Sequence, residues 1–183
     1  IFKFMRRILI IGSGRSASSL IRYLLSKSES ERLHIIVADL SLALAEKKTE
    51  GHLNATPLAL NIFEIEERKA AIQDASIVIS MLPAYLHIEI AKDCLEFKKH
   101  LVTASYINEA MQELDEEAKK NNLIFMNEIG LDPGIDHMSA MKVIDEIRAK
   151  GGKLLLFESF CGGLVAPEYD NNLWNYKFTW APR

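Results

Sequence analysis

The sequence predicts an α/β protein built on a doubly wound parallel sheet. Short apolar runs alternate with helical patterns along the chain, a glycine-rich turn follows the first run, and an acidic residue ends the second. The runs are almost continuously apolar rather than alternating, which is typical of parallel strands that are buried on both faces. Together these observations favour a Rossmann domain.

The elements of the predicted sheet can be read in chain order. Six apolar runs are expected to form strands: residues 7–11, 33–39, 55–60, 75–82, 100–103 and 123–126. Helices are expected at residues 16–26, 42–50, 64–73, 85–98, 108–121 and 136–150. Pro57 lies inside the third run and favours an edge position, because proline cannot donate to a strand ladder. Six strands suit a Rossmann sheet in the order 3-2-1-4-5-6.

The domain organisation follows from these patterns. Residues 1–128 are expected to form a dinucleotide-binding domain, and residues 129–183 to lie beyond it. A further strand is expected over residues 153–160. With 49% hydrophobic residues in 183, the chain can bury a substantial core.

Composition excludes several classes of function. A net charge of −3 gives no general basis for binding nucleic acid. No apolar run approaches the ~20 residues of a membrane span, and no secretory leader opens the chain, so no membrane partner and a cytoplasmic location are expected. The cysteines, Cys94 and Cys161, predict neither a disulfide framework nor a metal site. Acidic residues and a histidine over residues 128–137 lack a recognised ligand spacing, so no metal is expected.

The stretch from Gly12 to Ala17 reads Gly-Ser-Gly-Arg-Ser-Ala and joins the first strand to the first helix. Gly12 permits a tight turn, Gly14 lets the backbone approach a pyrophosphate, and Ala17 is small enough for close packing of helix on sheet. The phosphates would meet free N–H groups at the helix N-terminus. The alternative is a tight strand-to-helix turn without a ligand.

Asp39 closes the second strand, slightly later than the ~20-residue spacing typical of this fingerprint. A carboxylate there accepts hydrogen bonds from the ribose hydroxyls of adenosine and repels a 2′-phosphate. The sequence therefore favours NAD over NADP as cofactor. The alternative role is that of N-cap for the next helix, and both roles can hold together.

Polar residues also follow the fifth and sixth strands. Ser105 and Tyr106 are candidates to contact the substrate or the nicotinamide, unless they cap the helix that starts at Asn108. Asp132 and Asp136 flank a Pro-Gly turn and could bind a substrate ammonium, or serve as turn former and helix cap. The remaining histidines, His34, His52, His87 and His100, are interpreted as ordinary surface or strand-end residues.

Several longer motifs resemble the glutamate-forming saccharopine dehydrogenases, also called saccharopine reductases. They lie at residues 78–83, 102–106, 130–138, 161–164, 166–168 and 176–180, and the resemblance extends over the chain from Met5 onward. It implies a Rossmann domain over residues 1–128, followed by a larger α+β substrate and dimerisation domain with a mixed sheet. Residues 129–183 would be the beginning of that second domain, through which the full-length protein forms a homodimer. Because members of the family are considerably longer, the chain is expected to be a fragment.

The resemblance also implies roles for particular residues. Beside Gly12, which the glycine turn already assigns to the cofactor site, it implies cofactor contacts from these residues in or beside the strand-end loops: Ser13, Gly14, Arg15, Ser16, Asp39, Asn61, Thr103, Ala104, Leu131 and Pro133. It implies substrate contacts from Ser105, Tyr106 and Asp132, and places Cys161 near the active site. The chain departs from the family pattern at Asn61, where Asp is usual, and at Phe160, Val165 and residues 173–175. NADP-linked fungal members end the second strand with Cys-Arg, whereas Ala38-Asp39 is closer to the NAD-linked enzymes.

The reaction implied is oxidation of saccharopine at a secondary amine, with release of glutamate and aminoadipate semialdehyde in lysine metabolism. Tyr106 and Asp132 are the candidates for orientation and proton handling, with Cys161 as a third candidate or a small buried hydrophobic residue. Two alternatives stay open. One is a related dehydrogenase of carboxylated polyamines, and the other is a module that binds NAD without turnover. The fragment alone is expected to bind cofactor without activity.

Overall fold

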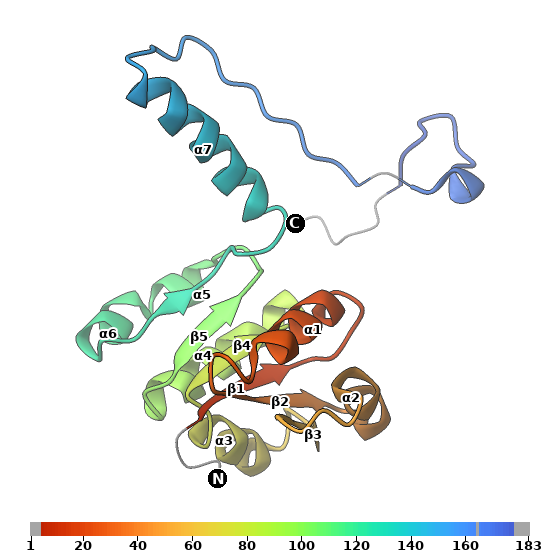
Figure 1. Cartoon of the computed structure of the whole chain (residues 1–183), viewed down its shortest axis with the longest axis vertical. Helices are drawn as coiled ribbons and strands as arrows, with labels where there is room; N and C mark the ends of the chain where they lie inside the picture. The colour runs from red at the N-terminus through yellow and green to blue at the C-terminus, as the bar shows by residue number, and fades with distance from the viewer. Residues whose placement is uncertain (1–4, 164, 178–183) are drawn as a thin grey trace. The chain divides into compact units, whose positions relative to one another are not determined.

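A computed structural model describes residues 5–163 and 165–177 of the chain (Figure 1). The chain divides into two compact units, Ile1–Gly134 and Ile135–Arg183. The first unit contains a six-stranded sheet in the order β3-β2-β1-β4-β5-β6, and every pair of neighbouring strands is parallel. This confirms the predicted Rossmann topology, in which the strand order reverses between β1 and β4.

The elements follow one another as strand and helix through the first unit. The strands are β1 Arg6–Ile11, β2 Leu33–Asp39, β3 Ala55–Ala59, β4 Ile77–Ser80, β5 His100–Thr103 and β6 Phe125–Met126. The helices are α1 Ala17–Lys27, α2 Leu42–Thr49, α3 Ile65–Gln73, α4 His87–Glu96, α5 Glu109–Gln112 and α6 Asp115–Lys120, with a 3₁₀ turn, η2, at Ala84–Leu86. As expected from Pro57, β3 is an edge strand.

The core has two layers because successive side chains of a strand point to opposite faces of the sheet. Ile8 and Ile10 of β1 pack with Ile21 of α1, on the face that also receives Ala45 of α2. On the opposite face, Leu9 and Ile11 pack in one cluster with Ile72 of α3, Ile90 of α4 and Met111 of α5. The sheet is thus covered on both faces, which explains the continuously apolar strands.

One expected helix of the first unit differs in the structure. The pattern over residues 108–121 forms two short helices, α5 and α6, instead of one. Asn108 begins α5, since its Oδ1 accepts a hydrogen bond from the N–H of Met111 at 2.9 Å. Met111 and Ala118 are buried as the periodicity predicts, so both short helices keep the expected inward side.

The second unit contains helix α7, Ile135–Ala149, and a 3₁₀ turn, η3, at Pro167–Tyr169. The strand expected over residues 153–160 is not formed, and this prediction was wrong (Figure 1). A strand needs a hydrogen-bonded neighbour, and no neighbouring strand is present within the described part of this unit. Leu164 and residues 178–180, which belong to two of the motifs above, lie outside the described residues.

Candidate functional site

The glycine turn after β1 lies at the carboxyl edge of the sheet and leads directly into α1. Gly12 has a φ of +101°, and a Cβ at this position would lie 3.0 Å from the backbone oxygen of Met81. Glycine is therefore required there by backbone conformation and by the close approach of the β4 end. Gly14 has open space around it, and Gly14, Arg15 and Ser16 are exposed. The turn thus offers an accessible backbone surface at a helix N-terminus, where anions bind.

Asp39 fastens this turn to the end of β2. One carboxylate oxygen, Oδ2, accepts hydrogen bonds from the N–H of Ser13 at 2.8 Å and from its hydroxyl at 2.7 Å. The other, Oδ1, accepts from the N–H of Ser41 at 3.0 Å. Burial opposes the charge, but the hydrogen bonds from Ser41 and Ser13 outweigh it and lower the pKa of Asp39. The carboxylate is therefore ionised near neutral pH and held in one orientation.

Asp39 is not the N-cap of α2, which was the alternative role predicted for it. Ser41 is the N-cap of α2, and its hydroxyl accepts from the N–H of Leu44 at 3.4 Å. Asp39 acts one step earlier, by fixing the backbone of Ser41. Ser13 is buried, and both its N–H and its hydroxyl donate to Asp39. Its cofactor contact stays a prediction.

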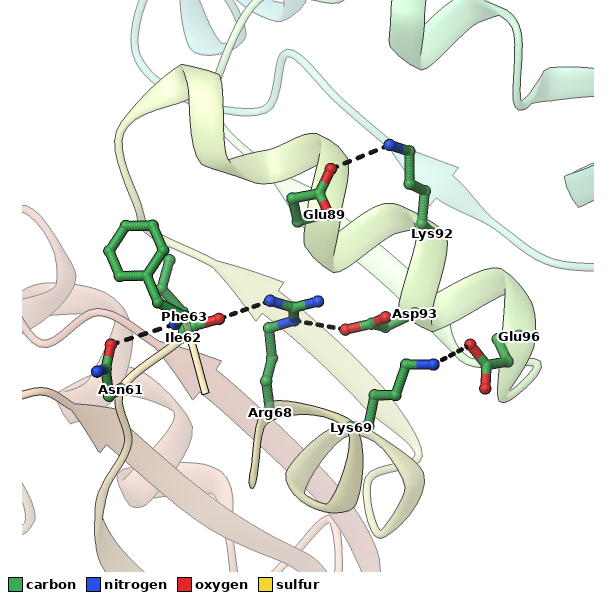
Figure 2. Close-up of polar contacts among 9 residues, drawn as sticks. All are labelled: Asn61, Ile62, Phe63, Arg68, Lys69, Glu89, Lys92, Asp93 and Glu96. Carbon is green, nitrogen blue, oxygen red and sulfur yellow. Dashed lines mark hydrogen bonds and ion pairs between the residues drawn. The ribbon is translucent and has the colours of Figure 1, made fainter. Parts of the chain in front are cut away.

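Asn61 lies just beyond β3, next to the Asp39 end of β2. The N–H of Leu60 donates to the backbone oxygen of Asp39 at 2.9 Å, which brings the two strand ends together. The side-chain oxygen of Asn61 accepts from the N–H of Phe63 at 3.2 Å and so shapes the loop into α3 (Figure 2). This loop is the part of the strand-end edge farthest from β5 in the sheet order.

A buried ion pair between α3 and α4 is hydrogen-bonded to the backbone of that loop. Arg68 of α3 donates through Nε to Asp93 of α4 at 2.6 Å, and through Nη1 to the backbone oxygen of Ile62 at 2.6 Å (Figure 2). Both charged side chains are less than a tenth exposed. The sequence did not single out this pair, because its members are far apart in the chain and become neighbours only when both helices pack on the same face.

The ends of β4 and β5 are joined by a histidine that the sequence analysis treated as ordinary. His87 begins α4 and is 3% exposed, and both of its ring nitrogens lie within hydrogen-bonding distance of hydroxyl groups. Its partners are Ser80, Thr103 and Ser105, so two of the predicted site residues contact it directly. The interpretation of His87 as a surface or strand-end residue was therefore wrong.

The segment after β6 meets the segment after β5. The N–H of Glu128 donates to the oxygen of Ser105 at 3.1 Å, and the side chain of Glu128 accepts from the N–H of Ile107 at 3.0 Å. The hydroxyl of Tyr106 donates to Oδ1 of Asp132 at 2.9 Å. Two predicted substrate residues, Tyr106 and Asp132, are thus brought together. Neither Ser105 nor Tyr106 caps α5, because Asn108 does.

The turn that carries Asp132 is closed by glycines. The N–H of Gly130 donates to the oxygen of Pro133 at 2.7 Å, and a Cβ on Gly134 would lie 2.3 Å from the oxygen of Gly130. Leu131 is exposed at the tip of the turn and Pro133 is buried. Ala104 lies beneath it, since its Cβ would be 3.1 Å from a Cβ at Gly130.

The remaining predicted residues belong to the second unit. Cys161 belongs to the second unit, where its side chain is exposed, and Asp136 lies in the first turn of α7. Across residues 5–163 and 165–177, no three His, Cys, Asp or Glu side chains are grouped as metal ligands would be. Within the same residues, no helix combines the length and the apolar composition needed to cross a bilayer.

A doubly wound parallel sheet, a glycine turn at the start of α1 and a carboxylate at the end of β2 define a dinucleotide-binding Rossmann domain. Comparison with known proteins identifies its family. Residues 8–126 match the family model described as the NADP-binding domain of saccharopine dehydrogenase, and residues 130–183 match the one for its C-terminal domain. The chain belongs to the saccharopine dehydrogenase family.

Individual relatives agree with this assignment. A protein of Pyricularia oryzae named saccharopine dehydrogenase [NADP(+), L-glutamate-forming] is 40% identical over 97% of the chain and 39% of the relative. The alpha-aminoadipic semialdehyde synthase of Arabidopsis thaliana is 38% identical over 96% of the chain and 18% of the relative. The apo structure of saccharopine dehydrogenase (L-Glu forming) from Saccharomyces cerevisiae matches 96% of the chain and 38% of that protein, with a TM-score of 0.79 and 38% identity. The chain therefore spans well under half the length of these relatives.

Proposed function

We propose that this chain is the dinucleotide-binding part, and the beginning of the substrate domain, of an oxidoreductase that oxidises saccharopine with a nicotinamide dinucleotide. The observation that carries the proposal is that two hydrogen-bonded groups of predicted site residues lie at the same edge of the sheet. Asp39 fastens the glycine turn on one side, and the Tyr106–Asp132 hydrogen bond lies on the other. Family membership supports saccharopine as the substrate.

The proposed reaction is the oxidation of a secondary amine, followed by hydrolysis of the imine. Saccharopine is a secondary amine whose nitrogen joins the lysine side chain to the glutamate skeleton. A hydride leaves the lysine-derived carbon beside the nitrogen and a proton leaves the nitrogen, which forms a C=N bond. Water adds to that bond, and cleavage of the C–N bond releases glutamate and aminoadipate semialdehyde. The dinucleotide, when bound, supplies the hydride acceptor.

Residues of the chain would hold the reactants. The exposed backbone of Gly14 to Ser16 fits a pyrophosphate, and Asp39 is fixed where it can accept hydrogen bonds from a ribose. Asp132 accepts from Tyr106 and retains lone pairs for the amine N–H of the substrate. We infer that Leu131 and Pro133 border the nicotinamide, that Asn61 borders the adenosine, and that Thr103 and Ala104 lie along the cofactor. Cys161 remains a proposed contributor from the second unit.

The choice between the two nucleotides rests on Asp39. The family model and the fungal relatives carry NADP in their descriptions, which points to NADP. An ionised carboxylate beside the ribose repels a 2′-phosphate, and for this reason we propose NAD for this chain. The ratio of the two dissociation constants, from fluorescence titration with NADH and NADPH, decides between them. Roughly tenfold tighter binding of NADH would correspond to about 1.4 kcal/mol. Tighter binding of NADPH would overturn the choice of NAD while leaving the dinucleotide site in place.

We further propose that residues 129–183 begin a substrate and dimerisation domain, that the whole protein is a homodimer, and that it is cytoplasmic. The match of residues 130–183 to the C-terminal family model supports the domain assignment. Light scattering of a full-length protein that contains this chain tests the dimer, and fluorescence microscopy of a tagged full-length protein tests the location.

The activity itself can be tested by grafting. Residues 1–183 replace the matching segment of the Pyricularia oryzae relative, which supplies the remaining length. Saccharopine-dependent formation of NADH or NADPH is then followed in the graft and in its fungal parent. The proposal predicts turnover in the graft, and its loss by at least tenfold in Asp132→Asn. A graft that binds nucleotide but does not oxidise saccharopine, beside an active parent, would contradict it.

Because the chain spans only 39% of the Pyricularia oryzae relative, we propose a different result for the isolated chain than for the graft. On its own, the 183-residue chain is expected to bind nucleotide without turning over saccharopine. Turnover by the graft of a carboxylated polyamine, but not of saccharopine, would instead favour the related polyamine dehydrogenase reaction.

A further inference from the structure

His87 is a buried titratable side chain at the strand-end edge, with three hydroxyl groups around its ring. Its Nδ1 lies 2.8 Å from the hydroxyl oxygen of Ser80, and its Nε2 lies 2.9 Å from that of Thr103 and 2.8 Å from that of Ser105. These partners come from the ends of β4 and β5 and from the segment that follows β5. One imidazole thus connects the two strands on the far side of the order reversal.

The environment of the ring favours the neutral imidazole. Burial lowers the pKa of His87, and hydroxyl groups stabilise a charge far less than a carboxylate does. A neutral ring has one N–H and one lone pair, and each contacting hydroxyl can either donate or accept. Both tautomers therefore keep hydrogen bonds on both sides of the ring, so its position does not depend on a proton from solvent.

Ser105 connects His87 to the proposed substrate residues Tyr106 and Asp132. Its side chain is fixed by His87, and its backbone oxygen accepts from the N–H of Glu128. The next residue, Tyr106, carries the hydroxyl that donates to Asp132. A shift of the imidazole would therefore be transmitted to the serine hydroxyl and to the start of the Tyr106–Asp132 contact.

The position of His87 in the sheet indicates which half of a bound dinucleotide a shift of its ring would affect. In the proposed site, Asp39 at the end of β2 would hold the adenosine side, and the glycine turn after β1, to which it is hydrogen-bonded, would hold the pyrophosphate. A dinucleotide that crosses the order reversal would continue over β4 and β5, which end at Ser80 and Thr103, with Ser105 two residues beyond β5. The half that reaches His87 and Ser105 is the nicotinamide half.

We propose that His87 is a positioning residue for the nicotinamide half of the site, which fixes the Ser105 hydroxyl so that it can hydrogen-bond the nicotinamide carboxamide or the substrate beside it. The inference rests on the proposed function. It assigns to His87 no contact with the reacting atoms, because its ring nitrogens are already occupied by hydroxyl groups.

Binding of two different ligands can test the two halves of the site separately. ADP-ribose contains the adenosine and the pyrophosphate but no nicotinamide, whereas NADH contains both halves. Dissociation constants of both are measured calorimetrically on the 183-residue chain and on His87→Phe, His87→Asn and Ser105→Ala. Phenylalanine removes every hydrogen bond of the ring, asparagine can restore part of them, and Ser105→Ala leaves the histidine in place.

The matched control is His34→Gln. His34 also bonds a hydroxyl, that of Thr56 at 2.9 Å, but it lies near the amino end of β2, opposite to the strand ends that carry the site. This control variant should bind both ligands as the wild type does.

The expected result is a selective loss. His87→Phe and Ser105→Ala should bind NADH about three- to tenfold more weakly with unchanged affinity for ADP-ribose, and His87→Asn should recover part of the loss. Equal weakening of both ligands, or no weakening in Ser105→Ala, would overturn the inference even if His87→Phe fails to fold. Absence of binding of both ligands to the wild type would overturn the proposed function, and the inference with it.

Discussion

Replacing Arg68 with methionine removes one half of the buried ion pair that joins α3 to α4 (Figure 2). The side chains of Arg68 and Asp93 are 8% and 6% exposed, and Nε of Arg68 lies 2.6 Å from Oδ2 of Asp93. Leaving a buried charge without its partner costs about 3–5 kcal/mol. The lost hydrogen bond to the oxygen of Ile62 adds about 1 kcal/mol. This is a large part of the about 5–15 kcal/mol that keeps a typical domain folded.

Urea denaturation followed by circular dichroism measures the change in free energy of unfolding. The double variant Arg68→Met/Asp93→Leu should recover to within about 2 kcal/mol of the wild type, because it removes both desolvated charges together. Lys69 and Glu96 provide a matched control between the same helices. Their ion pair is also 2.6 Å long but is solvent-exposed, so Lys69→Met should change stability far less (Figure 2). An Arg68→Met variant no less stable than Lys69→Met would refute the reasoning.

Three further predictions concern single residues. Gly12→Ala places a Cβ against the oxygen of Met81 at a positive φ, so it should destabilise the domain by about 1–3 kcal/mol, as measured by urea denaturation; an unchanged midpoint would contradict this. The folded-state pKa of Asp39 is depressed, so its contribution to stability is present above its ordinary pKa of 3.8 and is lost as pH falls through the lower folded value; acid unfolding of Asp39→Asn should lack this part of the transition. Burial raises the pKa of the Cys94 thiol to about 12, so alkylation mapped by mass spectrometry should label Cys161 and spare Cys94 in the folded chain.

Much of the first unit could be predicted from the sequence because its strands are short, continuously apolar and separated by helical patterns. The predicted range 33–39 is that of β2, the range 100–103 is that of β5, and Pro57 indicated the edge strand. These features depend on local composition and on burial of both faces. The expected strand over residues 153–160 failed for the converse reason, since a strand forms only with a partner that the apolar pattern does not specify.

The candidate site was predictable only where a residue type carries its own signature. The glycine turn and Asp39 match a known fingerprint with a slightly longer spacing, but the hydrogen bond from Ser13 to the carboxylate needs the folded turn. His87 gave no signal, because its three hydroxyl partners are 7 to 18 residues away and become neighbours only through parallel pairing of β4 and β5. Arg68 and Asp93 were missed in the same way, as contacts between two helices on one face.

The central claim, that the turn after β1 and Asp39 bind a nicotinamide dinucleotide, is tested most directly by calorimetric titration of the 183-residue chain with NADH and NADPH in parallel. The expected result is saturable one-to-one binding with preference for NADH, and at least tenfold weaker binding in Asp39→Ala. Tight binding that is unchanged in Asp39→Ala, or binding of neither nucleotide by the folded chain, would contradict the account.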